Sequence, residues 1–149
     1  MSRRSLVLVI LLGILLPLAV VHVVAQTNQE LVADIPFEFT VCSEQLPAGK
    51  YKVRSFSSAT PHVMLVRSDD SRSVIMACAH EVQVPKRTTT GKLIFNRYGD
   101  KYFLSELWLQ GEITGTELFK SEQEQALLRE SKETKRREKV TIKVTEAKP

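Results

Sequence analysis

The sequence has few of the residues on which enzymes and metal sites usually depend. Its 149 residues include only two cysteines and three histidines. It has no Gly-x-Ser-x-Gly motif to mark a serine nucleophile. Thr89 to Lys92 is similar to part of a phosphate-binding loop, but it lacks the first glycine and a Ser or Thr after the lysine. These absences predict a protein with no catalytic residues and no cofactor.

Long apolar runs are also missing, except at the N-terminus. There, two arginines precede an apolar segment from Leu6 to Val21, and the small residues Val23-Val24-Ala25 follow. This order is typical of a secretory signal peptide. We therefore expect residues 1–25 to be removed between Ala25 and Gln26. The protein would then be exported, to the periplasm or as a secreted protein.

An uncleaved N-terminal membrane anchor is the alternative. The apolar run from Leu6 to Ala25 has about 20 residues, close to the length that crosses a bilayer. Pro17 and the small residues before Gln26 favour cleavage, and no cysteine stands at the junction to carry a lipid. We expect a mature form that does not span the membrane.

The rest of the chain is neither long nor strongly charged. Two of the 21 Lys and Arg residues lie in the leader, so the 17 Asp and Glu residues leave the mature chain with a net charge of about +2. Such a charge gives no reason to expect a nucleic-acid partner. The length of residues 26–149 suits one domain and not two.

Segments in which apolar and polar residues alternate predict a β-domain over residues 33–120, after a linker at residues 26–32. Pro36 lacks an amide for strand pairing, so the first strand is expected at a sheet edge or to have Pro36 among its first residues. The predicted strands are Ile35–Val41, Lys50–Arg54, His62–Arg67, Ser73–Val84, Leu93–Tyr98 and Lys101–Trp108. The predicted turns and loops are Leu46–Gly49, Ser57–Pro61, Asp69–Arg72, Pro85–Gly91 and Gly111–Gly115.

After residue 120 the apolar pattern becomes that of a helix. Ser121-Glu-Gln-Glu124 is a capping box, in which the serine hydroxyl accepts a bond from a free amide and Glu124 reaches back to the cap. Residues 129–139 include no apolar side chain, so this half of a charged helix over residues 121–139 is expected to be solvated. Residues 140–149 are predicted to form a short strand, Val140–Thr145, and a tail.

These elements together predict the fold class. Six or seven short strands separated by turns, followed by one helix, are typical of small β-rich domains. We expect a mainly β protein, a small antiparallel β-sandwich or partly closed barrel with a C-terminal charged α-helix.

The densest group of aromatic and charged residues surrounds Gly99-Asp100. A two-residue loop with glycine first suits a type II′ hairpin turn. In that register Phe95 faces Leu104, and Arg97 faces Tyr102 with its guanidinium over the ring. We interpret the stretch as a structural turn. The alternative is a binding surface formed by the residues beside the turn, Arg97, Tyr98 and Asp100.

Sulfur and imidazole groups lie in two neighbouring predicted strands. His62 and Met64 share one face of the first strand, and Met76, Cys78 and His80 share one face of the second, a set that suits copper. An even loop between the strands puts Leu65 opposite Met76 and the two sets on opposite sides of the sheet. Because even loops are commoner, we predict no metal site. A small metal carrier or an enzyme based on Cys78 and His80 is the alternative.

Cys42 and Cys78 are the two cysteines of the chain. In an exported protein, an even number of cysteines favours a disulfide. Closing this loop would contribute roughly 3–4 kcal/mol on the loop-entropy model. Two free, buried thiols are the alternative, and the sequence does not decide between the two.

The segment Lys132–Lys139 carries five basic and two acidic residues. We interpret it as a solvated helix end whose basic residues suit the negative end of the helix dipole. The alternative is a surface that docks on an anionic envelope membrane.

Three stretches carry a resemblance to known proteins: Ile35-Pro-Phe-Glu-Phe-Thr-Val41, Leu46-Pro-Ala-Gly-Lys-Tyr-Lys-Val53, and Phe95 to Leu104 with Trp108. With them, the chain resembles an uncharacterised family of small bacterial β-rich proteins that carry a signal peptide and a C-terminal charged helix. The resemblance covers roughly residues 33–128. The family has no established activity, so it implies no substrate and no catalytic residue. Its pattern does not require cysteines at positions 42 and 78.

The sequence thus predicts an exported, non-catalytic β-domain that acts as an envelope-associated binding or structural module. Its ligand is not predicted, and its partner is either the envelope surface or another protein. A further alternative is an assembly module, in which the segment Val140 to Thr145 pairs with a sheet edge of another chain.

Overall fold

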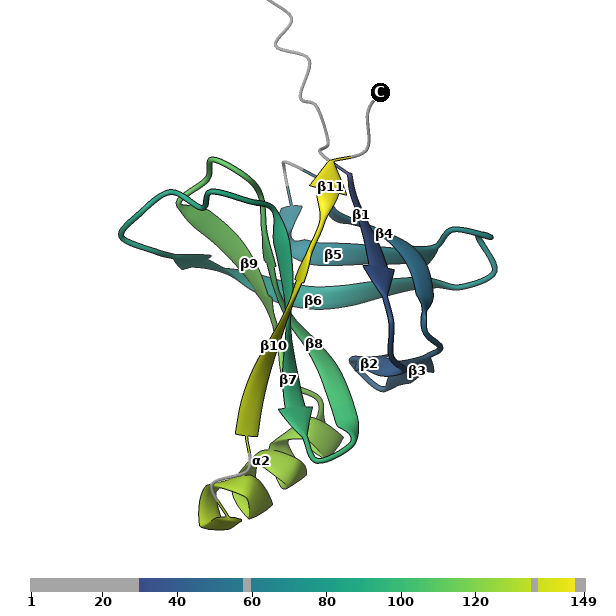
Figure 1. The fold of residues 1–149 in the computed structure, drawn as a ribbon, viewed down its shortest axis with the longest axis vertical. Coiled ribbons are helices and arrows are strands. Elements are labelled where there is room, and N and C mark those ends of the chain that lie inside the picture. Colours follow the sequence, from purple (N-terminus) through teal and green to yellow (C-terminus); the bar gives the residue numbers. More distant parts are fainter. Residues whose placement is uncertain (1–29, 58–59, 135–136, 147–149) are drawn as a thin grey trace, which may run out of the picture.

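The computed structural model describes residues 30–57, 60–134 and 137–146. The predicted leader, with its cleavage site at Ala25 and Gln26, lies outside the described residues. The described chain is mainly β, with one helix (Figure 1). Its elements are β1 (Leu31–Ile35), β2 (Phe39–Val41), β3 (Glu44–Leu46), β4 (Gly49–Ser57), β5 (Thr60–Ser68), β6 (Val74–Gln83), β7 (Lys92–Tyr98), β8 (Lys101–Trp108), β9 (Thr114–Leu118), α2 (Glu122–Thr134), β10 (Arg137–Lys143) and β11 (Thr145–Glu146).

The strands form two sheets that share β6. Residues 74–78 of β6 pair with β5 in sheet A, which has the order β11-β1-β4-β5-β6. Residues 79–83 of β6 pair with β9 in sheet B, which has the order β6-β9-β8-β7-β10. A strand that passes from one sheet to the other forms a corner of a sandwich. The hairpin of β2 and β3 joins sheet B through a short parallel pairing with β8.

The C-terminal segment also belongs to both sheets: β10 is in sheet B and β11 is in sheet A. β10 pairs with β7 along its whole length, and β11 then reaches β1 at the opposite end of the molecule (Figure 1). The strand order runs from β10 to β11 without closing into a complete barrel. The predicted fold class, an antiparallel sandwich or partly closed barrel with a C-terminal helix, is confirmed.

One core lies between the two sheets. Alternate residues of each strand point inward, as the two-residue period of a strand requires. The largest fully buried side chains of this core come from both sheets: Phe39, Phe95, Leu31, Ile35, Met64 and Leu93 among them. The described residues include no helix that is both long and apolar enough to cross a membrane.

Two predicted hairpins have the expected register. In the first, Leu65 pairs with Met76, so the loop between β5 and β6 is even. In the second, Arg97 pairs with Tyr102, and the φ angle of Gly99 is +61°, the sign that the first position of a type II′ turn requires. Phe95 faces Leu104 as predicted, and the ladder has a bulge between Ile94 and Phe95.

The N-terminal half differs from the prediction in its strand boundaries. The strand predicted over Ile35–Val41 is two strands, because the chain leaves the ladder after Ile35, where Pro36 has no amide to donate. A strand that was not predicted, β3, pairs with β2 across the turn at Cys42 and Ser43. The predicted loop Ser57–Pro61 is partly strand, because β4 and β5 pair as far as Ser57 and Thr60.

The predicted turn over Gly111–Gly115 is wrong at its second glycine. Gly111 has a φ angle of +81° and lies in a turn, but Gly115 belongs to β9. A Cβ atom on Gly115 would lie 2.6 Å from the ring of Trp108. Glycine therefore occurs in this strand because the indole ring lies directly on its backbone.

The helix ends earlier than the predicted residue 139. α2 ends at Thr134, and residues 137–139 belong to β10, where they pair with β7. Ser121 caps the helix as predicted, with its hydroxyl accepting the amide of Glu124 at 3.2 Å. The Glu124 side chain, however, is buried and accepts a bond from Asn96 of β7 at 2.7 Å. The first turn of α2 is therefore attached to sheet B.

Candidate functional site

Arg97, Tyr98 and Asp100, the alternative binding surface at the β7–β8 turn, have three different surroundings in the structure. Arg97 lies over the Tyr102 ring, 5.4 Å from its centroid, as predicted. Its Nε donates to the Gly99 carbonyl at 2.8 Å, and its Nη1 lies 3.4 Å from Glu138. These contacts hold the arginine on the hairpin and on β10.

Tyr98 has a structural role of another kind. Its side chain is buried, its ring meets Phe103 edge-on, and its hydroxyl lies 3.4 Å from Glu124. It therefore joins β7 to α2 and presents little surface to a ligand.

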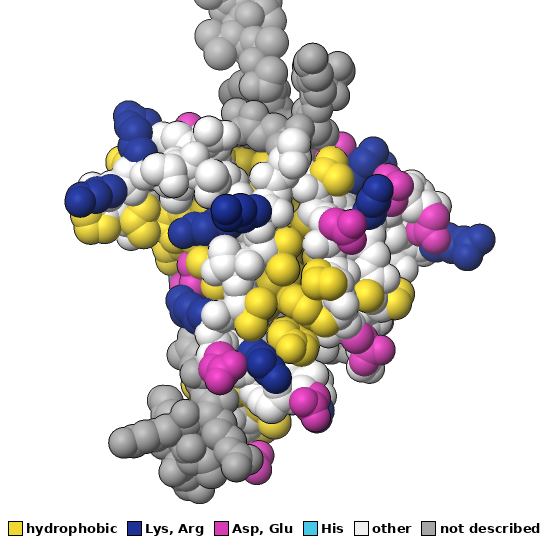
Figure 2. All heavy atoms as spheres, in the orientation of Figure 1, with side chains coloured by type: hydrophobic (Ala, Val, Ile, Leu, Met, Phe, Trp, Pro, Cys, Tyr) yellow, Lys and Arg dark blue, Asp and Glu magenta, His cyan; other side chains and the backbone are white. Residues whose placement is uncertain are grey.

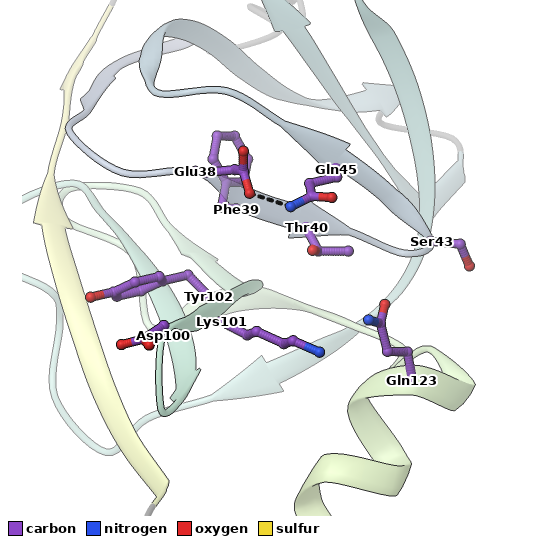
Figure 3. Close-up of a pocket in the computed structure, with 9 residues that line it drawn as sticks. All are labelled: Glu38, Phe39, Thr40, Ser43, Gln45, Asp100, Lys101, Tyr102 and Gln123. Atoms are coloured by element: carbon purple, nitrogen blue, oxygen red, sulfur yellow. Dashed lines mark hydrogen bonds between the residues drawn. The ribbon is translucent and has the colours of Figure 1, made fainter.

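Asp100 lines a hollow of about 220 Å³ between the β7–β8 turn, the β2–β3 hairpin and the start of α2 (Figure 3). Lys101 extends through it toward Gln123, and Gln45 donates a hydrogen bond to Glu38 on the opposite wall (Figure 3). Apart from Phe39, the lining residues are exposed or half-buried. The hollow is polar and lined mostly by exposed side chains, whereas ligand pockets are mostly apolar, so it is a weak candidate for a binding site.

The two cysteines are free thiols in the structure, Cys42 half-buried and Cys78 exposed. Burial raises the pKa of the Cys42 thiol, and the charge of Cys78 raises it further. A hydrogen bond with the Cys78 backbone lowers this pKa, but by less. Cys42 therefore stays protonated and is a poor nucleophile at neutral pH. The disulfide stays a prediction, and intact mass with and without reductant, which differ by two hydrogens if it forms, tests it.

The sulfur and imidazole groups lie on both sides of sheet A. Met64 is buried in the core, whereas Met76 and Cys78 are on the outer face, as the even loop requires. His80 follows on β6, 3.5 Å from Glu117, and the side chain of His62 lies outside the described residues. Among the residues that the structure describes, no three His, Cys, Asp or Glu side chains are placed to hold a metal ion.

An apolar seam borders the C-terminal strand. Figure 2 shows apolar side chains gathered beside this strand. Partly buried apolar residues that pack against the core include Phe37, Tyr102, Val140, Ile142 and Val144. The rings of Phe37 and Tyr102 stack at 4.0 Å, and Phe37 meets Phe95 at 5.2 Å. The seam is thus filled by the protein's own rings, which makes it the edge of the core.

The most exposed apolar side chains lie elsewhere, on the outer face of sheet A. In an antiparallel ladder, residues directly opposite each other project to the same face. The ladders place Lys52, Arg67 and Val74 in one row, Arg54, Leu65 and Met76 in the next, and Val63 beside Cys78. The intervening residues, Val53, Met64, Val66 and Ala77, are buried on the other face. We call this set of eight residues the outer face of sheet A: Lys52, Arg54, Val63, Leu65, Arg67, Val74, Met76 and Cys78.

Apolar and basic residues divide this face between them. Val74 and Met76 are 56% and 62% exposed, and they lie in neighbouring rows of the same face. The Phe119 amide donates to the Cys78 carbonyl at 3.1 Å, which places Phe119 next to Cys78. Phe119 is 58% exposed and therefore extends the apolar row. The basic side chains lie on β4 and the adjoining part of β5.

The charge of this face is only partly neutralised. Arg67 pairs with Glu30 at 3.3 Å. Within the described ranges, Lys52 and Arg54 form no ion pair. An apolar row beside unneutralised cations is typical of a surface that binds a partner.

Sequence reasoning missed this face, although the sequence contains a signal for it. Residues 74–79 are an uninterrupted apolar run. In an antiparallel sheet with one solvated face, apolar and polar residues normally alternate. A run without alternation indicates that the second face of the strand is also apolar.

The outer face of sheet B is covered by contacts within the chain. Glu106 is buried and accepts bonds from Lys139 of β10 at 2.7 Å and from the Trp108 indole at 2.8 Å. Burial alone would raise the pKa of Glu106. The bonds from Lys139 and Trp108, with the charges of Lys139 and Lys92, hold this pKa below its usual value. Glu106 therefore stays ionised and fixes β10 to the sheet.

Comparisons of the chain with protein-family models, with curated proteins and with solved structures found no match. The residues of this chain and their geometry are therefore the basis for a function.

Proposed function

We propose that this protein is an exported, non-catalytic binding module of the bacterial envelope, and that its binding site is the outer face of sheet A. The exposed apolar row of Val74, Met76 and Phe119 carries the proposal, together with Lys52 and Arg54 two strands away on the same face. Soluble domains rarely leave such a row uncovered unless a partner binds it.

Export is supported by the leader-like segment at residues 1–25. N-terminal sequencing of the protein from the periplasm or medium is expected to start at Gln26. A retained leader would favour the N-terminal membrane anchor and would place the domain at the membrane surface.

The absence of catalysis is supported by how the reactive groups are placed. Cys78 is exposed on a sheet face, Cys42 has a raised pKa, and Met64 lies on the opposite side of the sheet. The competing hypothesis is a metal carrier based on Cys78 and His80. Stoichiometric copper or zinc in the purified protein would favour it.

Assembly through the C-terminal strand stays a prediction. β10 uses one edge to pair with β7 of its own chain, so pairing with another chain would involve its other edge. Unchanged sizing-column behaviour after deletion of residues 129–149 would count against it.

Retention in the envelope tests the binding site. We expect the wild-type protein to stay with envelope fractions during a low-salt wash and the variant Val74→Asp/Met76→Asp to be released. Both residues are exposed, so the variant should fold normally, as circular dichroism can verify. The control is Ile113→Asp, which changes an exposed apolar residue in the turn before β9. Equal release of wild type and the double variant would contradict the proposed site.

A further inference from the structure

The two sheets differ in whether a helix covers them. α2, the one helix in the described part of the chain, contacts β7 and β10 of sheet B. Within the described residues, no helix covers the outer face of sheet A, although that face also carries apolar residues. An apolar sheet face is normally buried against a helix or another sheet. In the described part of the chain, the outer face of sheet A therefore lacks a second layer.

The dimensions of the apolar row fit a helix. From Val74 to Cys78 the row follows β6 for about 13 Å at the usual rise of a strand, before β6 passes into sheet B. It continues onto Phe119, whose ring lies 5.1 Å from that of His80. A helical segment of about nine residues, between two and three turns, has the same length.

The charges of this face determine which charge a partner should carry. Lys52 and Arg54 lie side by side on β4, along one flank of the apolar row, with Arg67 between them and Val74. Of these three basic residues, only Arg67 forms an ion pair within the described chain, and its partner is Glu30. A ligand that lies along β5 and β6 therefore meets cations on the flank over β4, where acidic side chains are favoured.

We propose that the outer face of sheet A binds an acidic amphipathic helix of a partner protein. Its apolar stripe would lie on Val63, Leu65, Val74 and Met76, and its acidic flank would face Lys52 and Arg54. This inference rests on the proposed function and adds the class of partner. An anionic membrane is the less suitable occupant, because interfacial binding uses amphipathic helices or lipid chains that enter the bilayer, whereas this face is a sheet surface.

Two synthetic peptides of about 18 residues test the proposal. Each is an amphipathic helix with leucine at every third or fourth position, and one carries glutamates on its flank where the other carries lysines. We expect the glutamate peptide to bind the purified protein at least about tenfold more tightly than the lysine peptide, measured by fluorescence anisotropy.

Variants locate the binding on this face. Lys52→Glu/Arg54→Glu is expected to reverse the preference, so that the lysine peptide binds more tightly than the glutamate peptide. Met76→Asp is expected to weaken binding of the glutamate peptide by about tenfold or more. The control Lys143→Glu reverses an exposed charge on β10 and should leave both affinities unchanged.

Three outcomes would overturn the helix proposal. The first is that neither peptide binds, or that both bind equally and Lys52→Glu/Arg54→Glu changes nothing. The second is that phosphatidylglycerol vesicles retain the wild type but not this variant, which would make lipid the occupant. The third is a dimer in sedimentation that Met76→Asp dissociates, which would make a second copy the occupant. If the peptides fail while Val74→Asp/Met76→Asp still releases the protein from the envelope, the proposed function stands and only the helix is rejected.

Discussion

The outer face of sheet B is covered by contacts within the chain, whereas the outer face of sheet A is exposed. On sheet B, Trp108 lies on Gly115, Glu106 is bound by Lys139, and the first turn of α2 covers Tyr98. On sheet A, Val74 and Met76 project into solvent on the same face as Lys52 and Arg54. The outer side chains of sheet B stabilise the fold, whereas the outer side chains of sheet A contribute little to its stability. A surface whose apolar residues are not needed for folding is available for binding.

The two methionines of sheet A give the largest expected contrast in stability. Met64 is fully buried in the core and Met76 is 62% exposed on the outer face. Met64→Ala should lower the free energy of unfolding by about 2–5 kcal/mol, because it leaves a cavity. Met76→Ala should change it by less than about 0.5 kcal/mol. Urea denaturation measures both, and a similar loss in the two variants would show that the outer face is part of the core.

Gly115→Ala probes how tightly sheet B is packed. The new Cβ would lie 2.6 Å from the Trp108 ring, so the indole or the strand has to move. We expect a loss of about 1–3 kcal/mol and a changed tryptophan fluorescence. Gly49→Ala is the matched control, because its Cβ meets Tyr51 at an ordinary 3.7 Å. Unchanged fluorescence and stability in Gly115→Ala would refute the described packing.

Glu106→Gln tests the ion pair that attaches β10 to sheet B. The pKa of Glu106 is lowered in the folded protein, so its contribution is present above the unfolded pKa, about 4.3, and is lost as the pH falls through the lower, folded pKa. We expect the variant to be less stable than wild type by about 1–3 kcal/mol at pH 7. The difference should shrink below pH 4. Glu138→Gln, which removes an exposed partner of Arg97, is the control and should cost at most about 0.5 kcal/mol.

Ser121→Ala has the smallest expected effect on sheet B. It removes the hydroxyl that accepts the Glu124 amide, and such caps contribute about 1 kcal/mol. Thermal unfolding should show a slightly lower midpoint, while the peptide binding proposed for sheet A should not change. A loss of that binding would show that the helix on sheet B supports the outer face of sheet A.

The features that the sequence predicted correctly depend on local rules. A glycine before Asp100 defined the β7–β8 hairpin and placed Arg97 over Tyr102. An even loop defined the pairing of Leu65 with Met76. Both follow from turn geometry and from the alternation of side chains, which neighbouring residues decide.

The features that were missed depend on distant residues. In the sequence, Gly115 has the pattern of a turn glycine, and only the structure shows that it makes room for the Trp108 ring. Glu124 has the pattern of a capping residue, and only the structure shows that its side chain binds Asn96 of β7. The charged start of β10 has no apolar pattern, but backbone pairing with β7 and the bond from Lys139 to Glu106 hold it as a strand. The apolar run at residues 74–79 did not reveal which of its faces the core covers.

The reactivity of Cys78 tests the central claim most directly, because this thiol belongs to the outer face of sheet A and is exposed. Alkylation of Cys78 by a maleimide should be fast in purified protein treated with reductant. It should be at least about tenfold slower in intact envelopes treated in the same way, where the partner covers the face. A cysteine at position 138 in a Cys78→Ser background, placed on sheet B, should react equally fast in both. Equal rates for Cys78 in the two preparations would contradict the account.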